Sequence, residues 1–297
     1  MQRLIAILVA ASLPLAAVAA PSKARVAKAA SVVTTADFTK DGDPNLQSSQ
    51  VLVLDPKSGQ TLYSKNADHA VPIASITKVM TAMVVLDAKL PLDEVLEIGT
   101  EDVDLIKNSN SRLPVGSHFR RDDLLRLALM ASDNRAASAL GRHYPGGIGA
   151  FVDAMNAKAK ALGLLNTRYV DSSGLQPGNV SSALDLGKLV AAANEYPLIR
   201  EYSTTGAVEV QLPESKRKLS FVNTNALVRS SDWQIGLSKT GYISESGKCL
   251  VMHAMIANQP IVIVLLDSWG RLTRVGDANR IRKWLEKNPG KLAVRGG

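Results

Sequence analysis

The chain contains 297 residues, of which 46% are hydrophobic, and its formal net charge at pH 7 is +8. This composition is typical of a globular protein with a sizeable core. The single cysteine, Cys249, excludes an intrachain disulfide and lies in an apolar run, where a small buried side chain is expected. The basic residues are scattered, with no basic helix and no interleaved aromatic residues, which argues against nucleic-acid binding. Their charge favours anionic polymers and acidic peptides as partners, although solubility alone also accounts for it.

Residues 1–19 have the pattern of a secretory signal peptide. Arg3 gives a positive start, Leu4–Leu15 an apolar centre, and Ala17–Ala19 a cleavage site of small residues. The apolar run is short for a membrane span, which disfavours the alternative of an uncleaved anchor. Residues 20–46 are rich in Ala, Ser, Thr and Lys and are interpreted as a flexible leader. We therefore expect an exported protein whose folded domain begins near residue 47.

Two short strand-like runs, Gln50–Leu54 and Gln60–Ser64, flank the Pro- and Gly-containing turn Asp55–Gly59 and predict a β-hairpin. The stretch Pro72–Leu86 then predicts a helix that is apolar on nearly every side and ends near Pro91. A helix of that kind belongs in the middle of a domain.

The next part of the chain is dominated by helical patterns, and the last part returns to strands. Helices are predicted at residues 121–130, 135–143, 148–162 and 182–195, the last with a capping-box-like start. Strands are predicted at residues 207–212, 218–222, 234–242, 248–257 and 261–267, with a turn at 258–260, and a final helix at 277–287. The final helix has a narrow apolar stripe, so packing against a sheet is favoured over lying on a membrane surface. Strands at both ends predict one sheet, with a helical subdomain inserted at roughly 91–200 and a cleft where the two meet.

Ser75 and Lys78 stand at the start of the apolar helix, three residues apart. Residues at this spacing share one helix face, so the lysine can reach the serine hydroxyl. A serine and a lysine at the buried start of such a helix indicate a nucleophile and its base. Ser-x-x-Lys is common by chance, and a second copy, Ser215–Lys218, lies in a charged, turn-like stretch that we interpret as a solvated loop.

Two further motifs fall where a cleft around Ser75 needs them. Ser132-Asp133-Asn134 interrupts two apolar helical patterns, where polar residues are costly to bury without a role, although a simple helix-joining turn is the alternative. Lys239-Thr240-Gly241 ends a strand-like run. Its cation and hydroxyl can hold a carboxylate, and its glycine lets backbone or ligand approach closely.

Together, Ser75-x-x-Lys78, Ser132-Asp133-Asn134 and Lys239-Thr240-Gly241 resemble the signature of penicillin-binding proteins and serine β-lactamases. The surrounding sequence, over roughly residues 47–290, is similar to low-molecular-mass penicillin-binding proteins of the D-alanyl-D-alanine endopeptidase type. This resemblance implies an α+β fold of the β-lactamase/DD-peptidase kind. Its antiparallel sheet of about five strands is flanked by helices and carries an inserted all-helical subdomain, here followed by a tail at 291–297.

The resemblance also implies roles for single residues. Ser75 would be the nucleophile, Lys78 its base, and Ser132 the relay of a proton to the departing amine. Asn134 would hold Lys78 and the substrate amide. The oxyanion would lie between the backbone N–H groups of Ser75 and Tyr242.

The Lys239-Thr240-Gly241 strand would bind substrate, with Thr240 contacting its carboxylate and Gly241 allowing close approach. A free lysine has a pKa of ~10.4, and lowering the pKa of Lys78 to ~7, equivalent to ~4 kcal/mol, would make it an effective base. Burial beside the cationic Lys239 would act in that direction.

The implied reaction is cleavage of D-alanyl cross-links in peptidoglycan by a serine peptidase, in a bacterial periplasm, without a cofactor or metal. The expected partners are cross-link peptides and, as covalent inhibitors, β-lactam antibiotics; other wall enzymes stay open as partners. The mature protein should be soluble or only loosely attached to the envelope. The histidines show no metal-ligand spacing.

Three alternatives to this function stay open to different degrees. A DD-carboxypeptidase would remove terminal D-alanine, and a β-lactam- or wall-binding scaffold would have no turnover, although intact Lys78, Ser132 and Lys239 argue against it. Class A β-lactamases add a deacylating glutamate, but residues 166–175 contain only one acid, Asp171. We therefore expect a long-lived penicillin adduct rather than rapid antibiotic hydrolysis.

Overall fold

The structure is a computed structural model that describes residues 37–212, 215 and 217–292. The predicted signal peptide, most of the predicted leader and residues 293–297 of the predicted tail lie outside the described residues. Among the described helices, none is both long and apolar enough to cross a membrane.

Within the described residues, the central sheet has five strands in an entirely antiparallel arrangement. In spatial order the strands are β2 (Thr61–Lys65), β1 (Gln50–Leu54), β11 (Gln259–Ser268), β10 (Gly247–Ile256) and β9 (Gln234–Ile243). The N-terminal hairpin therefore pairs with the last strand of the chain. This arrangement confirms the prediction that both ends of the chain join in one sheet of about five strands.

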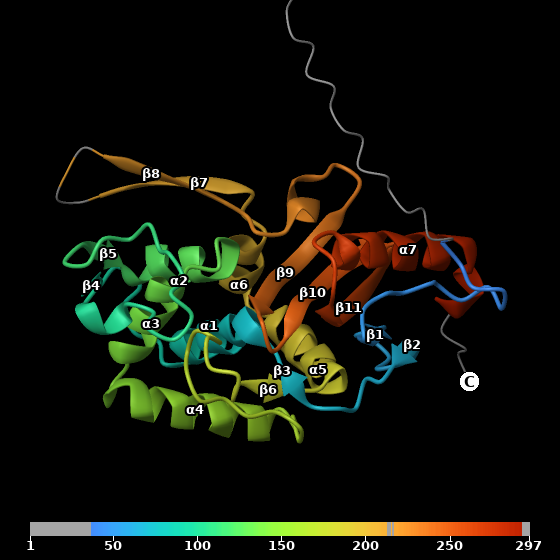
Figure 1. Cartoon of the computed structure of the whole chain (residues 1–297), viewed down its shortest axis with the longest axis horizontal. Coiled ribbons are helices and arrows are strands. Elements are labelled where there is room, and N and C mark those ends of the chain that lie inside the picture. Colours follow the sequence, from blue (N-terminus) through green and yellow to red (C-terminus); the bar gives the residue numbers. More distant parts are fainter. Residues whose placement is uncertain (1–36, 213–214, 216, 293–297) are drawn as a thin grey trace, which may run out of the picture. The chain divides into compact units, whose positions relative to one another are not determined.

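Helices cover both faces of this sheet, as predicted (Figure 1). Strands β1 and β11 are apolar at nearly every position because alternate side chains enter two different cores. Val51 and Ile263 pack in the core between the sheet and α7 (Thr273–Lys287), and this core includes Trp284. Leu52 and Val264 pack in the core on the opposite face, with α5 (Ala183–Ala193).

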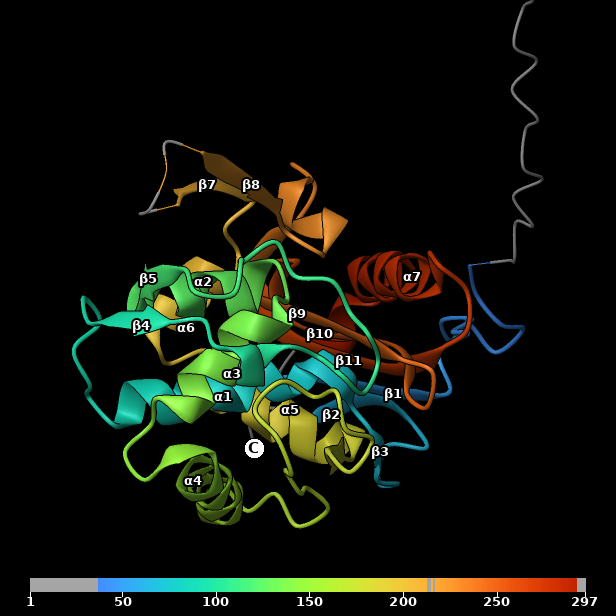
Figure 2. The same ribbon diagram turned by 60° about the vertical axis from the view of Figure 1, so that its left-hand side comes forward.

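The helical insertion lies beside the sheet, with its helices grouped together in two views (Figures 1 and 2). Its helices are α2 (Arg121–Met130), α3 (Asn134–Arg142), α4 (Gly147–Ala161) and α6 (Pro197–Ser203), and they surround α1 (Thr77–Asp87). The α5 helix, which the sequence places in the insertion, packs on the sheet instead.

The sequence predicts an all-helical insertion, but this part of the chain also contains short strands. Strand β4 (Val95–Glu97) pairs with β5 (His118–Arg120), and β3 (Val71–Pro72) pairs with β6 (Val180–Ser181). These runs of two or three residues are too short to show a strand pattern in the sequence. Strands β7 (Ala207–Gln211) and β8 (Lys218–Val222) form a separate hairpin that projects over α2 (Figure 1).

Several predicted boundaries need correction. The β10–β11 connection is the two-residue turn Ala257–Asn258, with both φ angles positive, so Pro260 lies within β11 opposite Met255 rather than in the turn. Helix α7 begins at Thr273, four residues before the predicted start, because a glycine and polar residues hide its first turn. Helix α6 was not predicted, although Pro197 occupies its first position as in many helices.

Residues 37–46, which the sequence assigns to a flexible leader, are ordered against α7. Asp37 pairs with Lys283 at 2.8 Å, and the Lys287 ammonium lies 4.6 Å from the centre of the Phe38 ring. Leu46 is buried in the same core as Trp284. The folded part therefore begins earlier than residue 47.

A buried carboxylate ties this N-terminal segment to α7. Asp277 accepts hydrogen bonds from the backbone N–H of Gln47 at 3.1 Å and of Ser48 at 2.7 Å, and from the Ser48 hydroxyl at 2.6 Å. Arg280, one turn further along α7, pairs with it at 2.5 Å. The Asp277 side chain is fully buried, so these donors replace the water that it loses.

Replacing Asp277 with alanine should lower the free energy of unfolding by about 3 kcal/mol, because Arg280 and two backbone N–H groups lose a buried partner. Urea unfolding followed by circular dichroism measures this loss. The exposed Asp41 is the control, and Asp41→Ala should change stability by less than about 0.5 kcal/mol. Equal stability of the two variants would contradict the anchoring role of Asp277.

Candidate active site

Ser75 lies in a short 3-10 turn, η1 (Ala74–Ile76), directly before α1. Ala74 has a φ angle of +47°, which is strained for a residue with a Cβ atom, and the turn is held by an Ile76 N–H to Ile73 carbonyl bond of 3.2 Å. Thr77 donates its hydroxyl to the Ala74 carbonyl at 2.8 Å. Ile73 and Ile76 are buried on either side, so the turn fixes the half-exposed Ser75 at the surface of the core.

Lys78 is fully buried in the first turn of α1. Its Nζ donates to Ser75 Oγ at 2.8 Å, to Asn134 Oδ1 at 2.6 Å and to the Ser173 carbonyl at 2.6 Å. An ammonium has three donors, so these three acceptors satisfy it without water. The three-residue spacing predicted the contact with Ser75.

The Ser132-Asp133-Asn134 motif joins α2 to α3 and lines the site at the same time. Ser132 has a φ angle of +60°, and the Asp133 side chain caps α3 by accepting from the backbone N–H of Ala136 at 2.9 Å. Asn134, the first residue of α3, holds Lys78 through its oxygen and donates its Nδ2 to Ser109 Oγ at 2.7 Å. The turn interpretation and the site interpretation of this motif are therefore compatible.

Strand β9 closes the third side of the site. Lys239 is buried, and its Nζ donates to Ser132 Oγ and to the Thr240 carbonyl, both at 2.8 Å. The Thr240 hydroxyl donates to Thr224 Oγ1 at 2.6 Å. A Cβ atom on Gly241 would lie 2.9 Å from the Ile73 carbonyl, so only glycine lets β9 approach the Ser75 turn this closely.

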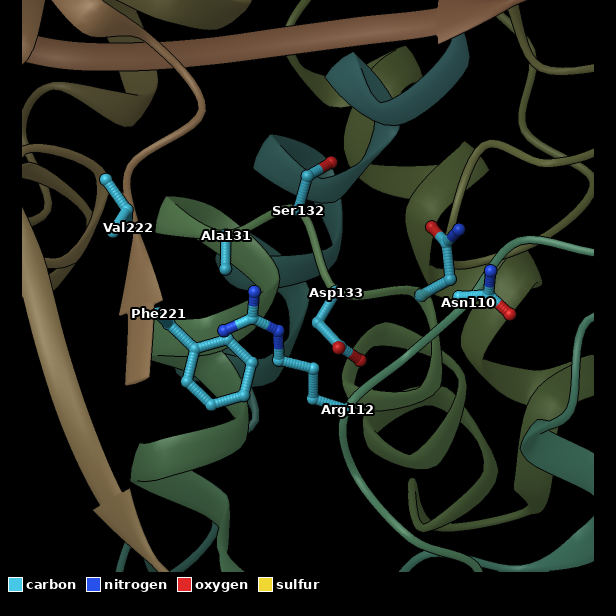
Figure 3. Close-up of a pocket in the computed structure, with 8 residues that line it drawn as sticks. Asn110, Arg112, Ala131, Ser132, Asp133, Phe221 and Val222 are labelled. Carbon is cyan, nitrogen blue, oxygen red and sulfur yellow. The ribbon is translucent and has the colours of Figure 1, made fainter. Parts of the chain in front are cut away.

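Two of the cavities that border this centre contain the two serines of the predicted site. The larger, about 350 Å³, is lined by Ser75, Lys107, Ser109, Asn134, Leu175, Tyr242, Ile243 and Ser244. The smaller, about 240 Å³, is lined by Asn110, Arg112, Ala131, Ser132, Asp133, Asn134, Phe221 and Val222 (Figure 3). The structure thus brings all eight predicted site residues together, with Tyr242 largely exposed at the rim. The second Ser-x-x-Lys copy is not part of the site, since Ser215 and Lys218 are exposed at the β7–β8 hairpin.

The sequence profile of the D-alanyl-D-alanine carboxypeptidase family matches residues 37–269. The chain belongs to this family of serine D-Ala-D-Ala peptidases. Over 260 residues the peptidase is 50% identical to a D-alanyl-D-alanine endopeptidase of Pseudomonas aeruginosa, covering 86% of this chain and 84% of that protein. An Escherichia coli protein of the same name is 46% identical over 255 residues, with coverages of 86% and 82%.

Solved structures agree with this assignment. The crystal structure of the DD-transpeptidase of Streptomyces strain K15 superposes with a TM-score of 0.76 at 29% identity, covering 81% of this chain and 97% of that one. The expected β-lactamase/DD-peptidase fold is therefore confirmed for the peptidase.

Sequence reasoning gave the loop that follows α4 no part in holding Lys78. Its Ser173 carbonyl accepts from Lys78, and its Ser172 carbonyl accepts from the Thr81 hydroxyl at 2.6 Å. Asp171 shapes the loop, because its carboxylate accepts from the backbone N–H of Ser173 at 2.7 Å and of Gly174 at 2.5 Å. The only signal in the sequence was the turn-forming character of an Asp-Ser-Ser-Gly run.

Burial lowers the pKa of both lysines in the candidate active site, Lys78 and Lys239. Burial lowers the pKa of Lys78 to about 7, against the opposing attraction of Asp171, Asp133 and Asp104. Burial also lowers the pKa of Lys239 well below its usual range, with repulsion from Lys78 and Arg274 acting in the same direction. The direction agrees with the low pKa expected for Lys78, and desolvation is its main cause, whereas the charge of Lys239 is not among the causes.

The described residues include no group of three His, Cys, Asp or Glu side chains arranged to hold a metal. Cys249 lies on β10 and is fully buried, as predicted, and burial raises the pKa of its thiol to about 11. This cysteine therefore stays a protonated core residue at neutral pH.

Gly174 offers a test of how tightly the loop positions the site. A Cβ atom there would lie 1.9 Å from the Ala74 carbonyl oxygen and 2.9 Å from the Ser75 nitrogen. Gly174→Ala should therefore displace the Ser75 turn and slow acylation by penicillin at least about tenfold. Stopped-flow or gel-based labelling measures that rate.

Gly163 provides the matched control for this variant. It also has a positive φ angle, +65°, but nothing lies within 4 Å of the position of its Cβ. Gly163→Ala should lose about 1 kcal/mol of stability through backbone strain while keeping the wild-type acylation rate. Equal acylation rates in the two variants would show that the loop does not position Ser75.

Proposed function

We propose that this peptidase is an endopeptidase that hydrolyses the D-alanyl bond to the diamino acid in peptidoglycan cross-links, through an acyl-enzyme on Ser75. The observation that carries the proposal is the contact of Ser75 with a buried Lys78 whose pKa is about 7. The names of the two curated relatives at 50% and 46% identity support the choice of endopeptidase over carboxypeptidase.

Acylation begins with the neutral amine of Lys78 removing the Ser75 proton across their 2.8 Å contact. The alkoxide forms a bond to the D-alanyl carbonyl carbon, and the carbonyl oxygen becomes an oxyanion. Backbone N–H groups of Ser75 and Tyr242 stabilise that oxyanion, on either side of the close approach that Gly241 permits.

Collapse of this intermediate breaks the C–N bond. Ser132 gives its hydroxyl proton to the departing amine. It recovers a proton from the two buried lysines, Lys78 and Lys239, since Lys239 Nζ lies 2.8 Å from Ser132 Oγ. The proton that Lys78 accepted is thus balanced by the one that leaves with the amine. Thr240 and Lys239 hold the carboxylate of the leaving residue, and water then hydrolyses the ester on Ser75.

A β-lactam presents an amide carbonyl and a carboxylate to the same groups and acylates Ser75. No glutamate stands in residues 166–175 to activate water, and Asp171 is engaged by the backbone of its own loop. Hydrolysis of the penicillin adduct is therefore expected to be slow. We further propose that residues 1–19 are a signal peptide and that the peptidase acts in the periplasm, where its substrate lies.

The pH dependence of acylation follows from Lys78. Below its pKa of about 7, Lys78 is protonated and cannot accept a proton, so the acylation rate by penicillin should rise with pH and level off above about 7. Single-turnover labelling from about pH 5 to about pH 9 measures this profile. Lys78→Arg, which stays protonated, should give negligible acylation throughout, and a flat wild-type profile would contradict the role of Lys78 as base.

Incubation with purified muropeptides tests the proposed reaction. Cross-linked dimers should be converted to monomers, whereas Ser75→Ala should convert none and take up no labelled penicillin. Release of free D-alanine with dimers left intact would identify a carboxypeptidase instead. Penicillin labelling without turnover of either substrate would identify a binding scaffold.

A further inference from the structure

The smaller cavity has a composition that the acylation chemistry alone does not explain. We propose that it binds the leaving half of the cross-link, with Arg112 pairing with a carboxylate of that half beyond the reacting diamino acid centre. This subsite rests on the proposed endopeptidase function. It is the part of the site that distinguishes a cross-link from a terminal D-alanine.

The positions of the two catalytic serines assign the two cavities. Ser75, which keeps the acyl group, lines the larger cavity, and Ser132, which protonates the amine, lines the smaller one. Asn134 lines both, so a substrate that spans them passes beside Lys78. The acyl half then lies toward Tyr242, and the leaving half extends past Ser132 toward the β7–β8 hairpin.

The walls of the smaller cavity match a leaving half made of a methylene chain that ends in acidic groups. Phe221 and Val222 of β8 form an apolar side, and Val222 is 53% exposed. The Arg112 side chain runs alongside the Phe221 ring toward Ala131 (Figure 3), with its guanidinium carbon 5.8 Å from the ring centre. Arg112 also donates to the Ser220 carbonyl, which holds the guanidinium at the cavity.

Arg112 is the charge that this cavity offers to a ligand. The other charged residue in its lining, Asp133, already accepts from Ser111 at 2.7 Å and from the backbone N–H of Ala136 at 2.9 Å, and burial raises its pKa. Within the described part of the chain, no acidic side chain forms an ion pair with Arg112. A guanidinium fork is suited to a carboxylate, with which it forms two parallel hydrogen bonds.

A terminal D-alanine does not reach this subsite. Its single carboxylate belongs at Thr240 and Lys239 in the proposed mechanism, and nothing extends beyond it. The leaving half of a cross-link carries the diamino acid chain and further carboxylates. Arg112 should therefore contribute to cleavage of cross-links and not to acylation by small substrates.

The test compares Arg112→Gln with Arg120→Gln, a control that removes an exposed arginine of the insertion outside both cavities. In Arg112→Gln, kcat/KM for a muropeptide dimer should fall about tenfold. Acylation by penicillin should not change. Arg112→Lys should recover part of the lost rate, and Arg120→Gln should behave as wild type.

A modified substrate separates ligand binding from a structural role of Arg112. In a synthetic dimer amidated only at leaving-half carboxylates beyond the reacting centre, the wild-type rate should also fall about tenfold, and Arg112→Gln should cause no further loss. An unchanged dimer rate in Arg112→Gln, or an equal penalty on the amidated dimer, would overturn the subsite. Intact dimers with the wild-type peptidase would instead overturn the proposed function, and the subsite with it.

Discussion

The burial of one amine, Nζ of Lys78, is the constraint on which the rest of the structure depends. Its three acceptors come from the Ser75 turn, from α3 through Asn134 and from the loop after α4 through Ser173. A buried ammonium without partners costs several kcal/mol, so the segments that supply these oxygens must all be in place. The site therefore forms only when the Ser75 turn, the helical insertion and the loop are packed together.

The same burial sets the chemistry. With all three acceptors present, desolvation still lowers the pKa of Lys78 to about 7, so the amine is poised near neutral pH. Lys239 is equally buried, and the two lysines repel each other when both are charged. A carboxylate bound beside Lys239 offsets this repulsion, because an opposite charge nearby favours the protonated form. An anionic ligand therefore suits the region around Lys239, where the free protein disfavours a positive charge.

Much of this arrangement was predictable from the sequence, for identifiable physical reasons. The spacing of Ser75 and Lys78 on one helix face predicts their contact, and the hydrophobic runs at both ends of the chain predict a shared sheet. The positions of Ser132 and Lys239 in the cleft followed from the family resemblance and not from local pattern. Three segments far apart in sequence meet there through tertiary packing, which periodicity does not encode.

The contributions that sequence could not reveal come mostly from backbone atoms and isolated side chains. The Ser173 carbonyl has no side-chain signature, since every residue carries one, and its direction depends on the Asp171 loop. Arg112 stands in a loop without a motif and gains meaning only when β8 brings Phe221 beside it. Short ladders such as β4–β5 are likewise fixed by tertiary contacts rather than by propensity.

The strained backbone of the candidate active site is held in place by the packing of the surrounding core. Ala74, which directly precedes Ser75, and Ser132, which contacts Lys239, both have positive φ angles without being glycine. Each such residue costs on the order of 1–3 kcal/mol and persists only where its surroundings determine it. Around Ala74 those surroundings are buried Ile73 and Ile76, with Gly174 packed too closely for any larger residue. The packing energy of the core thus holds Ser75 and Ser132 in orientations that the local sequence disfavours, and that rigidity places their oxygens within reach of the two lysines.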